Sequence, residues 1–162
     1  MESLEILLKN QNRRMPYEEK QRLTEIKNNY YREYLQQMSP EDITSDVRNT
    51  LRVLRERKIK LAIGSSSKNA KLILKKTKMT QWFDVICDGN DISKSKPDPE
   101  VFVKAAEALQ MPRADCLVVE DADAGVLAAH GGGFACAGIG EAAKRRDVEF
   151  PLKKLSDLLE LR

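Results

Sequence analysis

Apolar residues follow one spacing in the first part of the chain and a different one in the rest. At first they recur every three or four positions, which is typical of amphipathic helices. Ser39-Pro40 interrupts this spacing, because proline disfavours helical geometry in the residue before it. The pattern predicts a short helical turn at Leu4–Leu8, a long helix between Pro16 and Met38, and a helix over Val47–Leu54 with Ser45 as its cap.

From residue 59 onward, short apolar strands alternate with amphipathic helices. This alternation is typical of a parallel sheet built from strand–helix–strand units, and it predicts an α/β fold. The predicted strands are Ile59–Gly64, Phe83–Cys87, Cys116–Glu120 and Phe134–Ile139. Helices are predicted after a cap at Asp98, between Glu120 and the three glycines at 131–133, and over Leu152–Leu159.

Composition narrows the class of protein. The chain has 162 residues, of which 41% are hydrophobic and 33% charged. This balance supplies one core and a solvated surface, unlike the composition of a disordered or fibrous chain. No apolar run approaches the ~20 residues of a membrane span, and the first residues lack the pattern of a signal peptide. A cytoplasmic protein with no membrane partner is therefore expected.

Charge and cysteine content argue against two further kinds of site. The 28 basic and 25 acidic residues give a net charge of +3, and no basic stripe carries interleaved aromatics, so nucleic-acid binding is not expected.

Five lysines lie between Lys68 and Lys78 without an acid, which predicts a solvated helix face except at Lys68. Three cysteines form no Cys-x-x-Cys pair, so they predict buried thiols: Cys87, Cys116 and Cys136.

Small polar residues follow the first predicted strand of the α/β part. In an open parallel sheet, ligands bind beyond the carboxyl ends of the strands. Backbone N–H groups at a helix start, serine hydroxyls and a lysine offer several donors to a phosphate. On this segment alone, a serine that caps an ordinary helix is the favoured alternative. The residues concerned are Ser65, Ser66, Ser67, Lys68 and Asn69.

Two more segments place charged residues at comparable positions. Lys96 lies between Ser95 and two nearby prolines, and a fixed ammonium can neutralise charge on a transferring phosphoryl group. An exposed lysine is the favoured alternative there. Glu120 and Asp121 follow an apolar strand and suit Mg²⁺, whereas a cap by Asp121 or Asp123 on the next helix is the alternative.

Taken in order, these three segments resemble the second, third and fourth motifs of the haloacid dehalogenase-like phosphotransferases. Within that superfamily the chain is similar to the β-phosphoglucomutase family over nearly its whole length, including Lys27-Asn28 and Ser39-Pro40-Glu41-Asp42. The resemblance implies the superfamily's Rossmannoid α/β fold. It also implies a partial helical cap over residues 1–43 and a core over residues 44–162.

The resemblance further implies a role for each candidate residue. Ser65 is expected to contact the transferring phosphoryl group beside the Ser66 amide, with Lys96 compensating the charge and Glu120 and Asp121 binding Mg²⁺. The implied substrates are β-glucose 1-phosphate and glucose 6-phosphate, with glucose 1,6-bisphosphate as the intermediate. The other phosphate of the substrate is assigned to Ser67, Lys68 and Asn69, and the sugar to Lys27 and Asn28.

One motif of the family is missing from the sequence. The family's nucleophile and acid–base aspartates form an Asp-x-Asp-Gly pattern, but Asp121-Ala122-Asp123 here is followed by Ala124. Met1 resembles an internal methionine of the cap, so the first strand of the sheet is expected to be absent and the chain to be inactive alone. Unpaired strand edges in the interior predict marginal stability. Self-association or a complementing N-terminal segment is expected to relieve it.

Two alternatives to a mutase stay open. A non-catalytic remnant would still bind phosphate or a sugar phosphate without turnover. A sugar phosphatase of the same superfamily would transfer the phosphoryl group to water instead of to a sugar, because one fold serves both outcomes.

Overall fold

The computed structural model describes residues 15–161, so the helical turn predicted at Leu4–Leu8 lies outside the described part. The chain divides into two compact units between Met38 and Ser39. The division predicted after residue 43 stays a prediction. In the first unit, helix α2 spans Tyr17–Gln37 and begins directly after Pro16, which confirms the long helix predicted from the apolar spacing.

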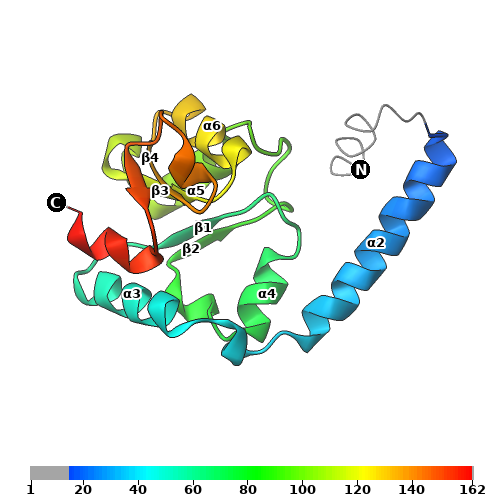
Figure 1. The fold of residues 1–162 in the computed structure, drawn as a ribbon, viewed down its shortest axis with the longest axis horizontal. Coiled ribbons are helices and arrows are strands. Elements are labelled where there is room, and N and C mark those ends of the chain that lie inside the picture. The colour runs from blue at the N-terminus through cyan, green and yellow to red at the C-terminus, as the bar shows by residue number, and fades with distance from the viewer. Residues whose placement is uncertain (1–14, 162) are drawn as a thin grey trace. The chain divides into compact units, whose positions relative to one another are not determined.

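The second unit alternates helices and strands, as the apolar pattern predicts (Figure 1). Its helices are α3 (Ser45–Glu56), α4 (Ala70–Lys76), α5 (Glu100–Leu109) and α6 (Asp123–Gly131). Its strands are β1 (Ala62–Gly64), β2 (Val85–Cys87), β3 (Leu117–Glu120), β4 (Ala135–Ile139) and β5 (Phe150–Leu152). Within residues 15–161, no helix has both the length and the apolar character that crossing a bilayer requires.

The strands form two parallel sheets. β1 pairs with β2 in one sheet, in the register Ala62 to Val85. The other sheet has the order β3-β4-β5, so β4 is paired on both sides. In the described part of the chain, β1, β2, β3 and β5 are therefore each paired on one side and open on the other.

Helices α5 and α6 build the main core against these sheets. α5 contributes Val101 and Phe102, and α6 contributes Val126, which is fully buried. The ring of Phe102 packs edge-on against Phe134, with 6.2 Å between ring centroids. A smaller core lies on α3 and α4, and a 3₁₀ helix at Leu155–Glu160 packs on α3. Apolar side chains of these helices thus pack against both sheets.

The predicted boundaries differ from the structure at several elements: β2 begins at Val85 instead of Phe83, and α5 begins after Pro99 instead of directly after the predicted cap Asp98. Three further differences have a clear local reason. β1 begins at Ala62 because the Ile59 N–H still donates to the Leu54 carbonyl at the end of α3. Thr44, not Ser45, caps α3 by accepting from the Val47 N–H. The predicted closing helix is replaced by β5 and the 3₁₀ helix, because the leucines at 155 and 158 also fit a three-residue repeat.

The three cysteines are free, as predicted, but only two are buried. Cys87 and Cys136 are buried, whereas Cys116 is partly exposed. Burial is the main cause that raises the pKa of all three thiols, for Cys136 to about 11. These side chains behave as small apolar groups at neutral pH.

Candidate active site

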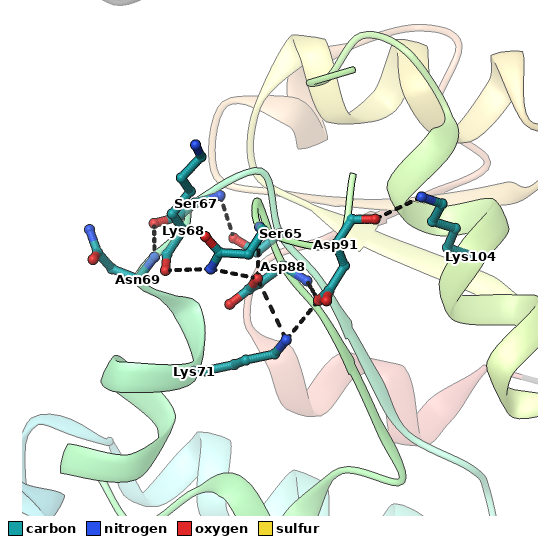
Figure 2. A network of polar contacts seen from close by, with 9 residues as sticks. Ser65, Ser67, Lys68, Asn69, Lys71, Asp88, Asp91 and Lys104 are labelled. Atoms are coloured by element: carbon teal, nitrogen blue, oxygen red, sulfur yellow. Dashed lines mark hydrogen bonds and ion pairs between the residues drawn. The ribbon is translucent and has the colours of Figure 1, made fainter. Parts of the chain in front are cut away.

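The segment after β1 is folded by its own serine hydroxyls. The Ser65 N–H donates to the Cys87 carbonyl over 3.0 Å and so continues the pairing of the two strands. Ser65 Oγ accepts from the Ser67 N–H and Ser67 Oγ from the Asn69 N–H, both over 3.2 Å (Figure 2). The backbone N–H groups of Ser66 and Lys68 donate to no other described residue. Two amides are thus available to a ligand.

Helix α4, which follows this segment, has seven residues and begins after Asn69 without a side-chain cap. The alternative of a serine capping an ordinary helix is therefore wrong, because the serines close turns ahead of the helix. Such a short helix contributes only a small dipole at its N-terminus. Binding of an anion here would depend on the Ser66 and Lys68 amides, the hydroxyls and the Lys68 ammonium.

Lys96 lies in a loop that is fixed from both sides. On one side, the Lys96 N–H donates to Ser66 Oγ over 3.2 Å. This bond joins the loop to residues 65–69, the serine segment. On the other side, the Glu100 carboxylate accepts from the N–H groups of Ser93 and Lys94. An ion-pair hydrogen bond from Lys104 and these loop donors lower the pKa of Glu100 to about 2. The start of α5 thereby anchors the Lys96 loop.

The Lys96 side chain is largely shielded from solvent, and its ammonium has two defined neighbours. It forms an ion pair with Glu120, and these two side chains are 16% and 9% exposed. The ammonium also lies 4.5 Å from the centroid of the Phe102 ring, a position favoured by the negative ring face. The alternative of an exposed lysine is therefore wrong. Each of the two charges is stable in the interior because the other compensates it.

Glu120 and Asp121 mark the end of β3 but have different surroundings. Glu120 is buried against α6, where a Cβ added at Gly125 would fall 2.1 Å from the Glu120 carboxyl carbon. Asp121 is exposed, and its carbonyl accepts from the Ala142 N–H. α6 begins after Ala122 without a side-chain cap, and Asp123 pairs with Arg145 over 3.1 Å. The alternative of an aspartate cap on α6 is therefore wrong.

The two carboxylates provide a partial ligand set for Mg²⁺. This ion takes one or two carboxylates and completes its octahedron with water and phosphate oxygens. Hard oxygen donors from adjacent residues at a strand end fit that requirement, and the space left by Gly125 admits the Glu120 carboxylate. Residues 15–161 contain no group of three or more His, Cys, Asp or Glu side chains suited to a metal. A bound Mg²⁺ would thus need further oxygen ligands.

The structure links the three predicted segments through one chain of contacts. Ser66 Oγ accepts from the backbone of Lys96, and the side chain of Lys96 pairs with Glu120. Lys27 and Asn28 are exposed on α2, in the other compact unit. The functional roles assigned to all these residues stay predictions.

Sequence reasoning missed the turn Asp88–Asp91, which contacts the serine segment directly. The Gly89 N–H donates to the Ser67 carbonyl over 3.2 Å, and Asn90 Nδ2 donates to the Lys68 carbonyl over 3.0 Å. The residues Asp88-Gly89-Asn90-Asp91 are a common turn sequence directly after a strand. That signal predicts a turn, but not which segment the turn contacts.

Comparison with known proteins gives one family. A family model described as haloacid dehalogenase-like hydrolase matches residues 4–139. A β-phosphoglucomutase of Bacillus subtilis (strain 168) is 35% identical over 144 residues, which are 88% of this chain and 64% of that protein. A phosphorylated carbohydrates phosphatase of Thermotoga maritima is 31% identical over 90 residues, 54% of this chain and 42% of that protein.

A solved structure agrees with these sequence relatives. The crystal structure of β-phosphoglucomutase from Clostridium difficile superposes with a TM-score of 0.84 at 30% identity, covering 97% of this chain and 71% of that one. The chain spans 64% of the length of the Bacillus subtilis relative.

Proposed function

We propose a function from one premise: the chain belongs to the haloacid dehalogenase-like hydrolases and has their Rossmannoid α/β fold of parallel strands and helices. Within that family, we propose that it binds a sugar phosphate for Mg²⁺-dependent phosphoryl transfer. The reaction proposed is the interconversion of β-glucose 1-phosphate and glucose 6-phosphate. Support comes from the β-phosphoglucomutases among its relatives.

The observation that carries this proposal is the chain of contacts from Ser66 through Lys96 to Glu120. Phosphoryl transfer needs little covalent chemistry from the protein and depends on positioning and on neutralising charge. In the proposed site, Ser65 and the Ser66 amide hold the transferring group, and Lys96 compensates its charge. Ser67, Lys68 and Asn69 hold the second phosphate, and Lys27 and Asn28 face the sugar.

Glu120 and Asp121 are the residues proposed to hold Mg²⁺. When bound, the ion would polarise phosphoryl oxygens and neutralise part of their charge. Glu120 is paired with Lys96, which holds the buried carboxylate in a fixed position beside the residue proposed to compensate the phosphoryl charge. Asp121 is exposed and adds a second carboxylate at small cost in desolvation.

The sequence has no Asp-x-Asp-Gly pattern, so no residue here fills the role of the nucleophilic aspartate. We propose that these residues bind a sugar phosphate without turnover and that a segment bearing the nucleophile completes the enzyme. A coupled assay of β-glucose 1-phosphate conversion tests this, with the chain alone and with a family peptide that carries Asp-x-Asp-Gly. Turnover by the chain alone would contradict the proposal, and a chain that binds glucose 6-phosphate but gains no turnover from the peptide would favour a non-catalytic remnant.

A sugar phosphatase is the second candidate, because the relatives also include a phosphorylated carbohydrates phosphatase. The two activities differ only in whether water or a sugar hydroxyl accepts the phosphoryl group. Release of inorganic phosphate by the complemented chain, measured beside glucose 6-phosphate formation, separates them. Phosphate release without isomerisation would favour the phosphatase.

A further inference from the structure

The turn at residues 88–91 packs directly on the serine segment without belonging to it. A Cβ added at Gly89 would fall 2.4 Å from the Ser66 carbonyl oxygen and 2.9 Å from the Lys68 nitrogen. Both atoms are backbone, so a methyl group cannot fit unless the two segments separate. Only glycine permits this approach.

The turn is itself rigidly held. Asp88 is fully buried, and its Oδ1 accepts from the backbone and side-chain N–H groups of Asn90 over 2.9 and 3.1 Å. Asp91 Oδ2 accepts from the Asp88 N–H over 2.8 Å. Lys104 of α5 donates to the Asp91 carbonyl over 2.7 Å. The turn is thus tied to the helix that also anchors the Lys96 loop.

Two hydrogen bonds pass from this turn to the serine segment. Gly89 N–H reaches the Ser67 carbonyl, and Asn90 Nδ2 reaches the Lys68 carbonyl. These two bonds engage the carbonyls of Ser67 and Lys68. Within the segment, the amides of Ser67 and Asn69 donate to serine hydroxyls. The Ser66 and Lys68 amides are left free in this arrangement.

The same turn compensates the charge of one nearby lysine, Lys71, but not that of the other, Lys68. Lys71 pairs with Asp91 over 2.8 Å and approaches Asp88 at 3.7 Å, so its charge is compensated. Figure 2 shows Lys71 reaching toward these acids and Lys68 extending away from them. Lys68 forms no ion pair with any residue in 15–161, and its charge is available to an anion.

We propose that Gly89 and Asn90 are positioning residues, which hold the serine segment in its phosphate-binding conformation. This inference rests on the proposed function, because it assumes that Ser66 and Lys68 bind phosphate. The turn acts through the backbone of Ser67 and Lys68 and does not touch the ligand. Its loss is expected to lower phosphate affinity while leaving the rest of the fold in place.

The test measures binding of inorganic phosphate and of glucose 6-phosphate to the full chain by titration calorimetry. Asn90→Ala is expected to weaken binding about tenfold, which corresponds to about 1.4 kcal/mol. Gly89→Ala is expected to weaken it further. Asn49→Ala, at an exposed position on α3, is the matched control and is expected to bind as the unchanged chain does.

Amide hydrogen exchange distinguishes positioning from a general loss of stability. In Asn90→Ala, the amides of Gly89 and Asn69 are expected to exchange about tenfold faster, with those of β4 unchanged, because only a local opening is favoured. Asn90 is exposed, so this variant remains decisive if Gly89→Ala does not fold. Absence of binding by the unchanged chain would overturn the proposed function and this inference together. Normal binding by both variants, or equal acceleration in β4, would overturn the inference alone.

Discussion

The Lys96 ammonium and the Glu120 carboxylate are each nearly buried, and each compensates the charge of the other. Removing one partner of a buried pair leaves an uncompensated charge, which costs more than removing both. The pair therefore stabilises the site as a unit. Its members cannot be exchanged independently.

We expect Lys96→Met to lower the free energy of unfolding by about 3 kcal/mol, because Glu120 is left buried without its partner. The double variant with Glu120→Gln is expected to recover most of that loss. Urea unfolding of the two single variants and the double variant gives the coupling energy. Additive effects would show that the two side chains do not interact in solution.

Lys68 and Lys75 provide a matched comparison of surface lysines. Lys68 belongs to the serine segment, whereas Lys75 lies in the last turn of α4. Lys68→Gln is expected to weaken glucose 6-phosphate binding about tenfold, because a charge-assisted hydrogen bond is lost. Lys75→Gln removes the same charge and is expected to change affinity less than twofold. Equal effects in calorimetry would indicate a general electrostatic attraction instead.

The Glu100 carboxylate gives the Lys96 loop a dependence on pH. Its pKa is lowered from 4.5 to about 2, first by the bond from Lys104 and then by the Ser93 and Lys94 donors. A depressed folded-state pKa contributes stability that is present above the unfolded pKa and is lost as pH falls. The contribution of Glu100 should therefore decline between about pH 4.5 and pH 2.

This decline is measurable at the Ser93 amide, which donates to Glu100. Its NMR chemical shift is expected to titrate with a midpoint near pH 2 in the unchanged chain. Glu100→Gln is expected to abolish the titration, because no ionisable partner remains. A midpoint near 4.5 would show that neither Lys104 nor the loop donors stabilise the ionised carboxylate.

At the scale of elements, the strands differ in how many neighbours they pair with. β4 has a partner on both sides, whereas β3 has one. Leu117 and Val119 of β3 are 39% and 37% exposed, so one face of that strand is exposed while Val118 on the other face is buried in the core. Half of its backbone groups have no partner strand among the described residues.

We expect the amides of β4 to exchange with solvent at least about tenfold more slowly than those of β3, because paired and covered amides open less often. Hydrogen exchange followed by mass spectrometry measures both strands in one experiment. Equal protection of β3 and β4 would mean that another chain or segment covers β3 in solution.

The elements predicted best from the sequence are those with long, regular apolar spacing. α2 and α5 have it, and the glycines at 131–133 mark the end of α6. β5 was missed because a three-residue strand containing Pro151 has too few positions to show alternation. Its place is set by pairing with β4. Pairing between segments distant in sequence cannot be predicted from the spacing of apolar residues within one segment.

The candidate site was predicted only in part. The order of its polar segments identifies Ser65, Lys96 and Glu120 as candidates after the strands. Local reasoning favoured an exposed lysine and helix caps instead, because burial of Lys96 depends on Glu120 and Phe102, which are supplied by other elements. The contact of Gly89 with Ser66 was likewise beyond prediction, since it arises from packing of two loops.

At the scale of the whole molecule, we propose that the complementing segment supplies a strand between β1 and β3, each of which is open on one side within residues 15–161, so we expect the chain without it to have low stability. Buried polar backbone groups without partners cost roughly 1–3 kcal/mol each, against a total of about 5–15 kcal/mol for a folded protein. We expect the isolated chain to unfold in urea with a free energy below about 5 kcal/mol. A family peptide carrying Asp-x-Asp-Gly should raise the unfolding free energy, and with it the midpoint, with the logarithm of its concentration once that exceeds its dissociation constant.

A scrambled peptide of the same composition is the control for that measurement. An unfolding free energy well above about 5 kcal/mol without any peptide would contradict the prediction. Sedimentation of the peptide-free chain shows in parallel whether a second copy covers the open edges. A dimer would explain high stability without a complementing segment.

Cys136 lies in β4, the strand paired on both sides, and is fully buried; its pKa is raised to about 11. At neutral pH only about one such thiol in ten thousand is ionised, so an alkylating reagent can label it only after the surrounding strands part. The rate of labelling at this position therefore reports how often the sheet opens. The native chain thus contains a chemical probe of its own breathing motions, one that needs no added dye or engineered residue.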